Sequence, residues 1–213
     1  QDVVTRLEQA RAIAAPNEQG SLEADLFDAY LNLAGQVMAA ADGKPVEVQR
    51  AVDLYNKALS LRPQEPTATA QRNWGQDYLN GYQDVKASNW EGAIAELQAV
   101  YSEQPGYQNG HAAQMLYDAY MAAGDALFAA NKPELAWERY FRASQLKGVN
   151  TSTAQALAGS LAYMVTPTPA PLASPTPPPA SLAQLQQPGS ATAGSGPLAP
   201  YKGKIAFLRT GHS

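Results

Sequence analysis

Cysteine is absent from this chain of 213 residues, and histidine occurs only twice, at His111 and His212. Without cysteine the chain forms no disulfide and no thiolate-bound zinc or iron–sulfur site. Two histidines argue against a multi-histidine metal site or a catalytic dyad. The sequence motifs of phosphate-binding loops, zinc peptidases and serine hydrolases are also missing. We therefore expect no catalytic residues, no metal and no cofactor.

Basic residues are in the minority, with 15 Lys and Arg against 19 Asp and Glu and a net charge of −4. This balance argues against a nucleic-acid-binding protein, because nucleic acid is a polyanion. No apolar run approaches the roughly 18–20 residues that a membrane-spanning helix needs. We expect neither a nucleic-acid partner nor a membrane span.

Proline and charge divide the chain near residue 165. Ten of the 16 prolines lie in residues 166–200, and residues 1–150 carry a net charge of −7 whereas the remainder carries +3. Proline lacks the amide donor and favours extended backbone in the residue before it. Residues 166–179 are therefore expected to form a polyproline II spacer. The sequence predicts a helical domain in residues 1–165, a Thr/Pro- and Gly/Ser-rich linker in 166–200 and a short arm in 201–213.

Apolar residues recur at every third and fourth position through residues 1–165, which is the spacing of amphipathic helices. Proline, glycine and turn residues divide this pattern into separate segments. The predicted class is all-α, with eight helices and no strand before residue 165. The expected helices are residues 2–13, 22–40, 45–62, 67–85, 90–103, 109–130, 133–147 and 151–164.

Three of the expected helices share an internal repeat. In each, an alanine is followed four residues later by a large apolar residue and three residues after that by a small one. The alanines are 42 and 43 residues apart, and the preceding helix carries a glycine each time. The repeats comprise Gly35, Ala51, Tyr55 and Ala58; Gly81, Ala93, Leu97 and Val100; and Gly124, Ala136, Tyr140 and Ala143.

This pattern resembles the tetratricopeptide repeat family, in which a glycine on the first helix is followed by an alanine, a large residue and a second alanine on the second helix. The resemblance covers residues 21–150. The repeat period exceeds the usual value of about 34 residues, and Gly148 stands where Pro63 and Pro105 end the first two repeats. It implies a right-handed α-solenoid whose concave face binds protein or peptide, with residues 151–164 as the capping helix. The residues implied to pack between its helices are Gly81, Ala93, Leu97, Gly124, Ala136 and Tyr140.

The sequence of the arm predicts a short β-strand. Ile205 and Phe207 would point to the same side of this strand, and Gly203 and Gly211 bound it. A solitary strand leaves its backbone donors and acceptors unpaired. Either the chain continues past Ser213 into a β domain, or the strand adds to another subunit. Residues 202–209 are weakly similar to the opening strand of a WD40-like propeller repeat of secreted bacterial proteins, which would fit the first explanation. The second explanation assigns partner binding to Tyr201, Lys202, Lys204, Ile205, Phe207 and Arg209.

Hydroxyl residues among the prolines predict either a glycosylated stalk or a bare spacer. The candidate acceptors of sugar are Thr166, Thr168, Ser174, Thr176 and Ser181, together with Asn150 in an Asn-Thr-Ser sequon. The first residue is Gln1 rather than Met, which predicts a removed leader or a shortened chain. Together with the spacer and the lack of cysteine, this favours an extracellular or cell-surface location.

These observations predict a non-enzymatic extracellular scaffold. Its most specific form is a self-assembling subunit of a homopolymeric surface fibre, in which the arm docks on neighbouring copies. The alternative is an envelope adaptor that binds another protein and is cut short before a downstream β-propeller.

A glycosylated spacer predicts that material from the native source has an intact mass above the 22.6 kDa of the bare chain. Intact-mass spectrometry measures this difference directly. A mass equal to that of the bare chain would remove the glycosylated stalk and weaken the surface assignment.

Overall fold

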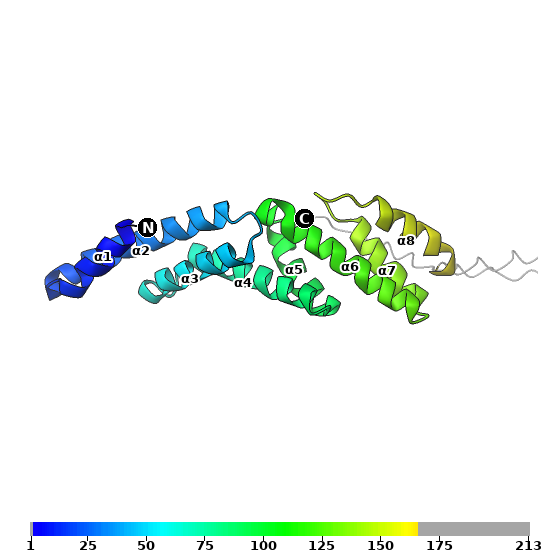
Figure 1. Cartoon of the computed structure of the whole chain (residues 1–213), viewed down its shortest axis with the longest axis horizontal. Coiled ribbons are helices and arrows are strands. Elements are labelled where there is room, and N and C mark those ends of the chain that lie inside the picture. The colour runs from blue at the N-terminus through cyan, green and yellow to red at the C-terminus, as the bar shows by residue number, and fades with distance from the viewer. Residues whose placement is uncertain (1, 166–213) are drawn as a thin grey trace, which may run out of the picture. The chain divides into compact units, whose positions relative to one another are not determined.

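The structure, a computed structural model, describes residues 2–165, and this part of the chain is all-α with eight helices and no strand. The expected class and number of helices are thus confirmed for these residues. The linker after residue 165, the arm residues 201–213 and the hydroxyl residues proposed for glycosylation lie outside the described residues. The helices are α1 (Asp2–Ile13), α2 (Pro16–Ala40), α3 (Pro45–Leu61), α4 (Pro66–Lys86), α5 (Trp90–Glu103), α6 (His111–Ala129), α7 (Pro133–Ser144) and α8 (Ser152–Val165), with a 3₁₀ turn, Tyr107–Gly110, before α6 (Figure 1).

Proline marks the start of half of the α-helices in the described range. Four helices begin with it, at Pro16, Pro45, Pro66 and Pro133. At the first position of a helix the missing N–H breaks no intrahelical bond, and the fixed φ already suits the helix. The backbone therefore enters α2, α3, α4 and α7 at positions that the sequence defines.

Each helix packs on the helix before it and on the helix after it, and Figure 1 shows them in chain order from α1 to α8. One continuous core is built mainly from α2 to α7. A smaller cluster joins α1 to α2 and α3, and another joins α7 and α8, with side chains of α6 packed against it. Most apolar contacts are thus made between helices that are neighbours in the sequence.

We call α2 with α3, α4 with α5, and α6 with α7 the three helix pairs. Two glycines allow very close approach between the helices of a pair. A Cβ atom added to Gly81 of α4 would lie 2.5 Å from Cγ of Leu97 in α5. At Gly124 of α6 it would lie 2.5 Å from Cε1 of Tyr140 in α7. Leu97 and Tyr140 are 0% and 3% exposed, so each fills the space that a side chain at the glycine would need.

The three repeat alanines are buried as well, and they are Ala51, Ala93 and Ala136. Each lies one turn before the large residue of its helix, where a small side chain lets the neighbouring helix approach. The repeat positions thus lie at helix–helix contacts of α3, α5 and α7.

Some predicted boundaries differ from those in the structure. Helix α2 begins at Pro16 rather than near residue 22, because its first turns are exposed and polar and therefore lack an apolar stripe. Helix α7 ends at Ser144, three residues before the expected end. Helix α6 begins at His111 rather than at Asn109, for a reason given below.

We expect Gly124→Ala to lower the free energy of unfolding by about 1–3 kcal/mol, the usual cost of overpacking. The Tyr140 ring has little freedom to move away, because its hydroxyl donates to Oδ1 of Asp125 at 2.7 Å. Urea unfolding measures the change.

The matched control is Gly20→Ala in α2, where no atom of the described residues lies within 4 Å of the added Cβ. This change should stabilise the chain by about 0.5–1 kcal/mol, since alanine favours the helix. Equal effects at the two glycines would contradict the close-packing argument.

Candidate functional site

The residues predicted to pack in the repeats are interior, so they shape the scaffold rather than present a surface. Asn150 is exposed in the loop before α8, and its Oδ1 accepts a hydrogen bond from the N–H of Ser152 at 3.1 Å. It therefore caps the start of α8. Whether it carries a glycan stays a prediction.

A pocket of about 320 Å³ lies between α2, α3, α4 and the loop before α6. Gly35 of α2 and Tyr55 of α3 line it. Leu97 follows Gly81, and Tyr140 follows Gly124, by 16 positions. Tyr55 follows Gly35 by 20 positions. The nearest side-chain atom to a Cβ added at Gly35 is the Tyr55 hydroxyl, 3.9 Å away. The first pair thus leaves open a space that Leu97 and Tyr140 fill in the others.

One wall of this pocket is a left-handed turn formed by Gln108, Asn109 and Gly110, with φ values of 52°, 54° and 87°. Such φ values are unfavourable for residues with a Cβ atom. They are incompatible with a right-handed α-helix, which is why α6 begins only at His111. A turn of this kind persists only where neighbouring contacts hold it.

The buried side chain of Gln108 makes these contacts with the end of α2. Its Nε2 donates to the backbone oxygen of Met38 at 3.0 Å, and its Oε1 accepts from the N–H of Gly43 at 2.9 Å. Next to it, Nδ2 of Asn109 donates to Oδ1 of Asp42 at 2.9 Å. These residues, which we call the Gln108 cluster, join two turns that lie 65 to 70 positions apart in the sequence.

Two tyrosines complete the Gln108 cluster. The Tyr78 hydroxyl of α4 donates to the backbone oxygen of Gly43 at 2.8 Å, and the Tyr107 hydroxyl lies 3.2 Å from Sδ of Met38. Burial raises the pKa of Tyr78 to about 12 and also raises the pKa of Tyr107. Both phenols therefore stay neutral hydrogen-bonding groups at physiological pH.

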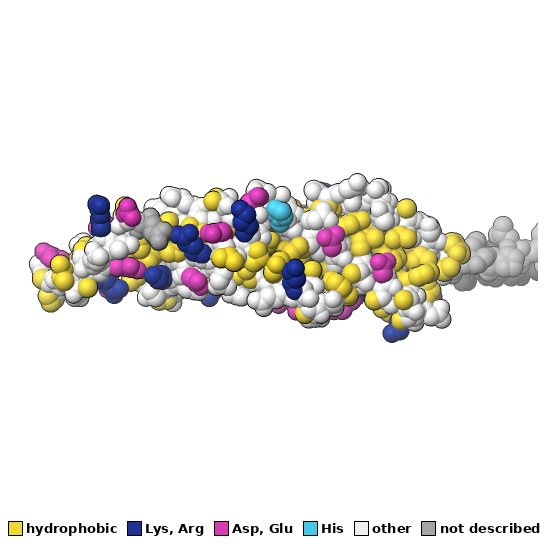
Figure 2. Space-filling model, viewed as in Figure 1, with side chains coloured by type: hydrophobic (Ala, Val, Ile, Leu, Met, Phe, Trp, Pro, Cys, Tyr) yellow, Lys and Arg dark blue, Asp and Glu magenta, His cyan; other side chains and the backbone are white. Residues whose placement is uncertain are grey.

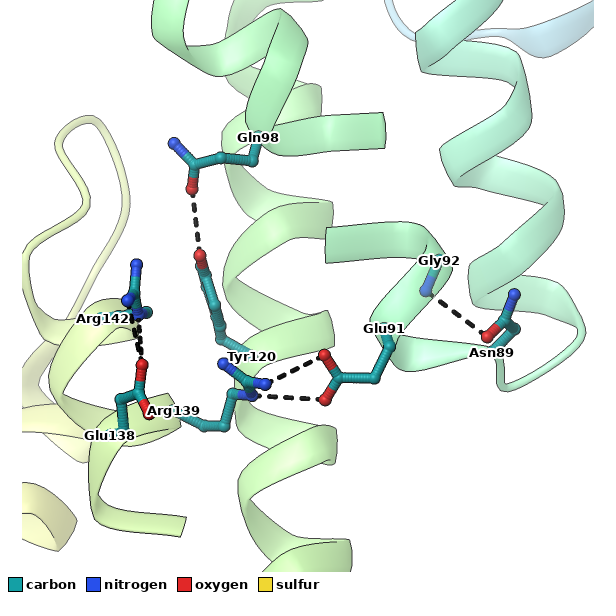
Figure 3. A network of polar contacts seen from close by, with 8 residues as sticks. All are labelled: Asn89, Glu91, Gly92, Gln98, Tyr120, Glu138, Arg139 and Arg142. Carbon is teal, nitrogen blue, oxygen red and sulfur yellow. Dashed lines mark hydrogen bonds and ion pairs between the residues drawn. The ribbon is translucent and has the colours of Figure 1, made fainter. Parts of the chain in front are cut away.

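A second polar network connects α5, α6 and α7 (Figure 3). Arg139 of α7 contacts Glu91 of α5 through two nitrogens, at 3.3 and 3.0 Å. The Tyr120 hydroxyl of α6 donates to Oε1 of Gln98 in α5 at 3.0 Å. The Arg139 guanidinium and the Glu91 carboxylate thus connect α7 to α5, which are the second helices of consecutive pairs.

The chemistry of the pocket is that of neutral hydrogen-bonding groups. Its walls offer the Tyr55 hydroxyl and the side-chain amides of Gln71 and Asn109.

Within residues 2–165 no group of three or more His, Asp or Glu side chains is placed to hold a metal ion. None of the helices in this range has the length and apolar character needed to cross a membrane.

Comparisons of the chain with protein families, with curated proteins and with solved structures gave no match. The resemblance to the tetratricopeptide repeat family therefore stays a prediction, which depends on the residues described above.

Sequence reasoning did not find the role of Gln108. The Asn-Gly pair at 109–110 signals a turn, and this signal alone would have moved the start of α6. Nothing in the local sequence indicates that a glutamine side chain bonds a turn 65 residues away.

Gln108→Ala should lower the free energy of unfolding by about 1–3 kcal/mol, because it removes two hydrogen bonds of a buried side chain and leaves the N–H of Gly43 without this partner. The control is Gln114→Ala on α6, an exposed residue bonded only to Asp118 one turn away. It should change stability by less than about 0.5 kcal/mol. Thermal unfolding by circular dichroism compares the two, and equal losses would show that the Gln108 cluster contributes no more than a surface contact.

Proposed function

We propose that this chain is a non-enzymatic scaffold built as a tetratricopeptide-like solenoid. The observation that carries the proposal is the recurrent glycine contact, in which Leu97 covers Gly81 and Tyr140 covers Gly124. Interfaces that recur along a chain suit an extended surface for other proteins more than a single enclosed active site.

The more specific proposal is a subunit of a homopolymeric fibre at the cell surface. The helical domain carries a net charge of −7, whereas residues 201–213 contain only basic charges. Within the helical domain, residues 87–131 include five acidic residues and neither Lys nor Arg. Opposite charge of this kind favours docking of the arm of one copy on α5 and α6 of the next.

The pocket beside the Gln108 cluster favours a second candidate, an adaptor that binds a segment of a different protein. Its hydroxyl and amide groups suit the backbone of an extended peptide. The two candidates differ in what the pure chain does alone, since a fibre subunit polymerises and an adaptor stays monomeric.

Deletion of residues 198–213 tests the fibre. We expect the full chain to form large species in sedimentation and the truncated chain to sediment as a folded monomer with little change in circular dichroism. Higher salt should weaken assembly of the full chain, because exposed ion pairs are screened.

A pair of substitutions in the arm serves as a matched control. Ile205→Asp should prevent assembly, because Ile205 and Phe207 would share the docking face of the strand. Ala206→Asp, on the opposite face, should interfere far less. A truncated chain that still polymerises would show that the helical domain carries assembly by itself. A full chain that stays monomeric would favour the adaptor.

A further inference from the structure

Helix α8 has the register of the first helices of the pairs. An alanine–glycine step occurs in α2, α6 and α8, and its alanine is buried in all three. The steps are Ala34–Gly35, Ala123–Gly124 and Ala158–Gly159. From Gly124 to Gly159 the interval is 35 residues, shorter than the 43 residues from Gly81 to Gly124 and close to the period of about 34 residues of the repeat family.

The glycine of α8 differs from the others in being uncovered. Gly159 is exposed, and no atom of the described residues lies within 4 Å of a Cβ added there. At Gly81 and Gly124 the same position is filled by the large residue of the following helix. Helix α8 thus has the form of a first helix without its second helix.

The outer face of α8 is uncharged and mixes small, polar and apolar residues, whereas the end of a helical stack normally presents a polar face to water. It is the one α-helix in the described range without a charged residue. Its exposed face follows helical spacing through Ser152, Ala156, Gly159 and Tyr163, and Tyr163 is 70% exposed. Figure 2 shows that hydrophobic side chains cover much of the end formed by α7 and α8.

Helix α1 has the complementary pattern of a second helix without its first helix. Val3, Leu7 and Ala10 follow the spacing of Ala136, Tyr140 and Ala143, and Pro16 follows as the breaker. Val3 is 64% exposed and Leu7 is half-buried.

One hydrogen bond supports this assignment of α1 independently. The Tyr30 hydroxyl of α2 bonds Glu8, the residue after Leu7, just as the Tyr120 hydroxyl of α6 bonds Gln98, the residue after Leu97. The contact between α1 and α2 therefore shares this bond with the contact between α5 and α6, although Tyr30 lies one position further from the glycine of its helix than Tyr120 does. Two charges of α1 are also paired within the chain, Glu8 with Lys57 and Arg11 with Glu23. Arg6 is an exposed charge on the same side of α1 as Val3 and Ala10.

We infer that α1 of a second copy docks on α8, with its Leu7 over Gly159, so that the succession of helices continues from one chain into the next. The inference rests on the proposed self-assembly and adds a contact between helical domains to the arm contact. The two surfaces lie on different ends of the chain, so the contact is head-to-tail. Such a contact extends into a filament when its rotation does not close.

The absence of cysteine makes a direct test possible. Chains carrying only Leu7→Cys or only Gly159→Cys are mixed and oxidised, and the product is analysed on a non-reducing gel. We expect a covalent dimer from the mixture and none from either variant alone, because only the mixture brings the two positions together. Gly20→Cys replaces Gly159→Cys in the control and should give no dimer with Leu7→Cys.

A second pair of variants measures the effect on assembly. Gly159→Leu fills the position that Leu7 would occupy and should abolish large species in sedimentation while leaving the helical content unchanged. Gly20→Leu, at an exposed helical glycine of α2, should assemble like the unmodified chain.

The outcomes separate this inference from the proposed function. If Gly159→Leu assembles normally while deletion of 198–213 prevents assembly, the α8 contact is wrong and the fibre proposal stands. If Gly159→Leu prevents assembly but no mixed disulfide forms, something other than α1 covers α8, such as residues 166–213, and the inference is overturned. A full chain that stays monomeric at every concentration overturns both.

Discussion

The close approach of a large side chain to a glycine is the constraint on which the helix pairs depend. Leu97 and Tyr140 occupy the space where Gly81 and Gly124 would otherwise carry a Cβ atom. This contact holds the two helices of a pair close together. The buried alanines one turn earlier are small enough to allow the same close spacing of the helices there. The first pair departs from the rule, since Tyr55 reaches Gly35 only with its hydroxyl, and a pocket of about 320 Å³ lies at this place.

Polar contacts add links between helices that are distant from one another in the chain. The core connects mostly helices that are neighbours in the chain, whereas the Gln108 cluster connects the end of α2 to the start of α6. Arg139 and Glu91 similarly connect α7 to α5. The buried Gln108 side chain makes two hydrogen bonds to backbone groups of residues 38 and 43, so its contribution is that of two hydrogen bonds in a mostly buried site.

The sequence was sufficient for the helices because their signals are local. Prolines at the first helical position and apolar spacing located α3, α4 and α5 to within one or two residues. The glycine and alanine spacing also identified positions that are buried in the structure, such as Ala93 and Tyr140. The Gln108 cluster was not predictable, because its left-handed turn is held by atoms of residues 38–43 that are remote in the sequence. A single sequence contains no local signal for such a contact.

The Gln108 cluster has a consequence for how the helical domain opens. In a row of helix pairs that touch only their neighbours, each pair can fray almost independently. The cluster spans α2 to α6 and makes this central part open as one unit, whereas α1 and α8 are each held from one side only. Exchange of amide hydrogens with solvent would therefore be slower in the helices that the cluster joins than in the two terminal helices. The domain thus has a centre that opens cooperatively and terminal helices whose opening requires less free energy.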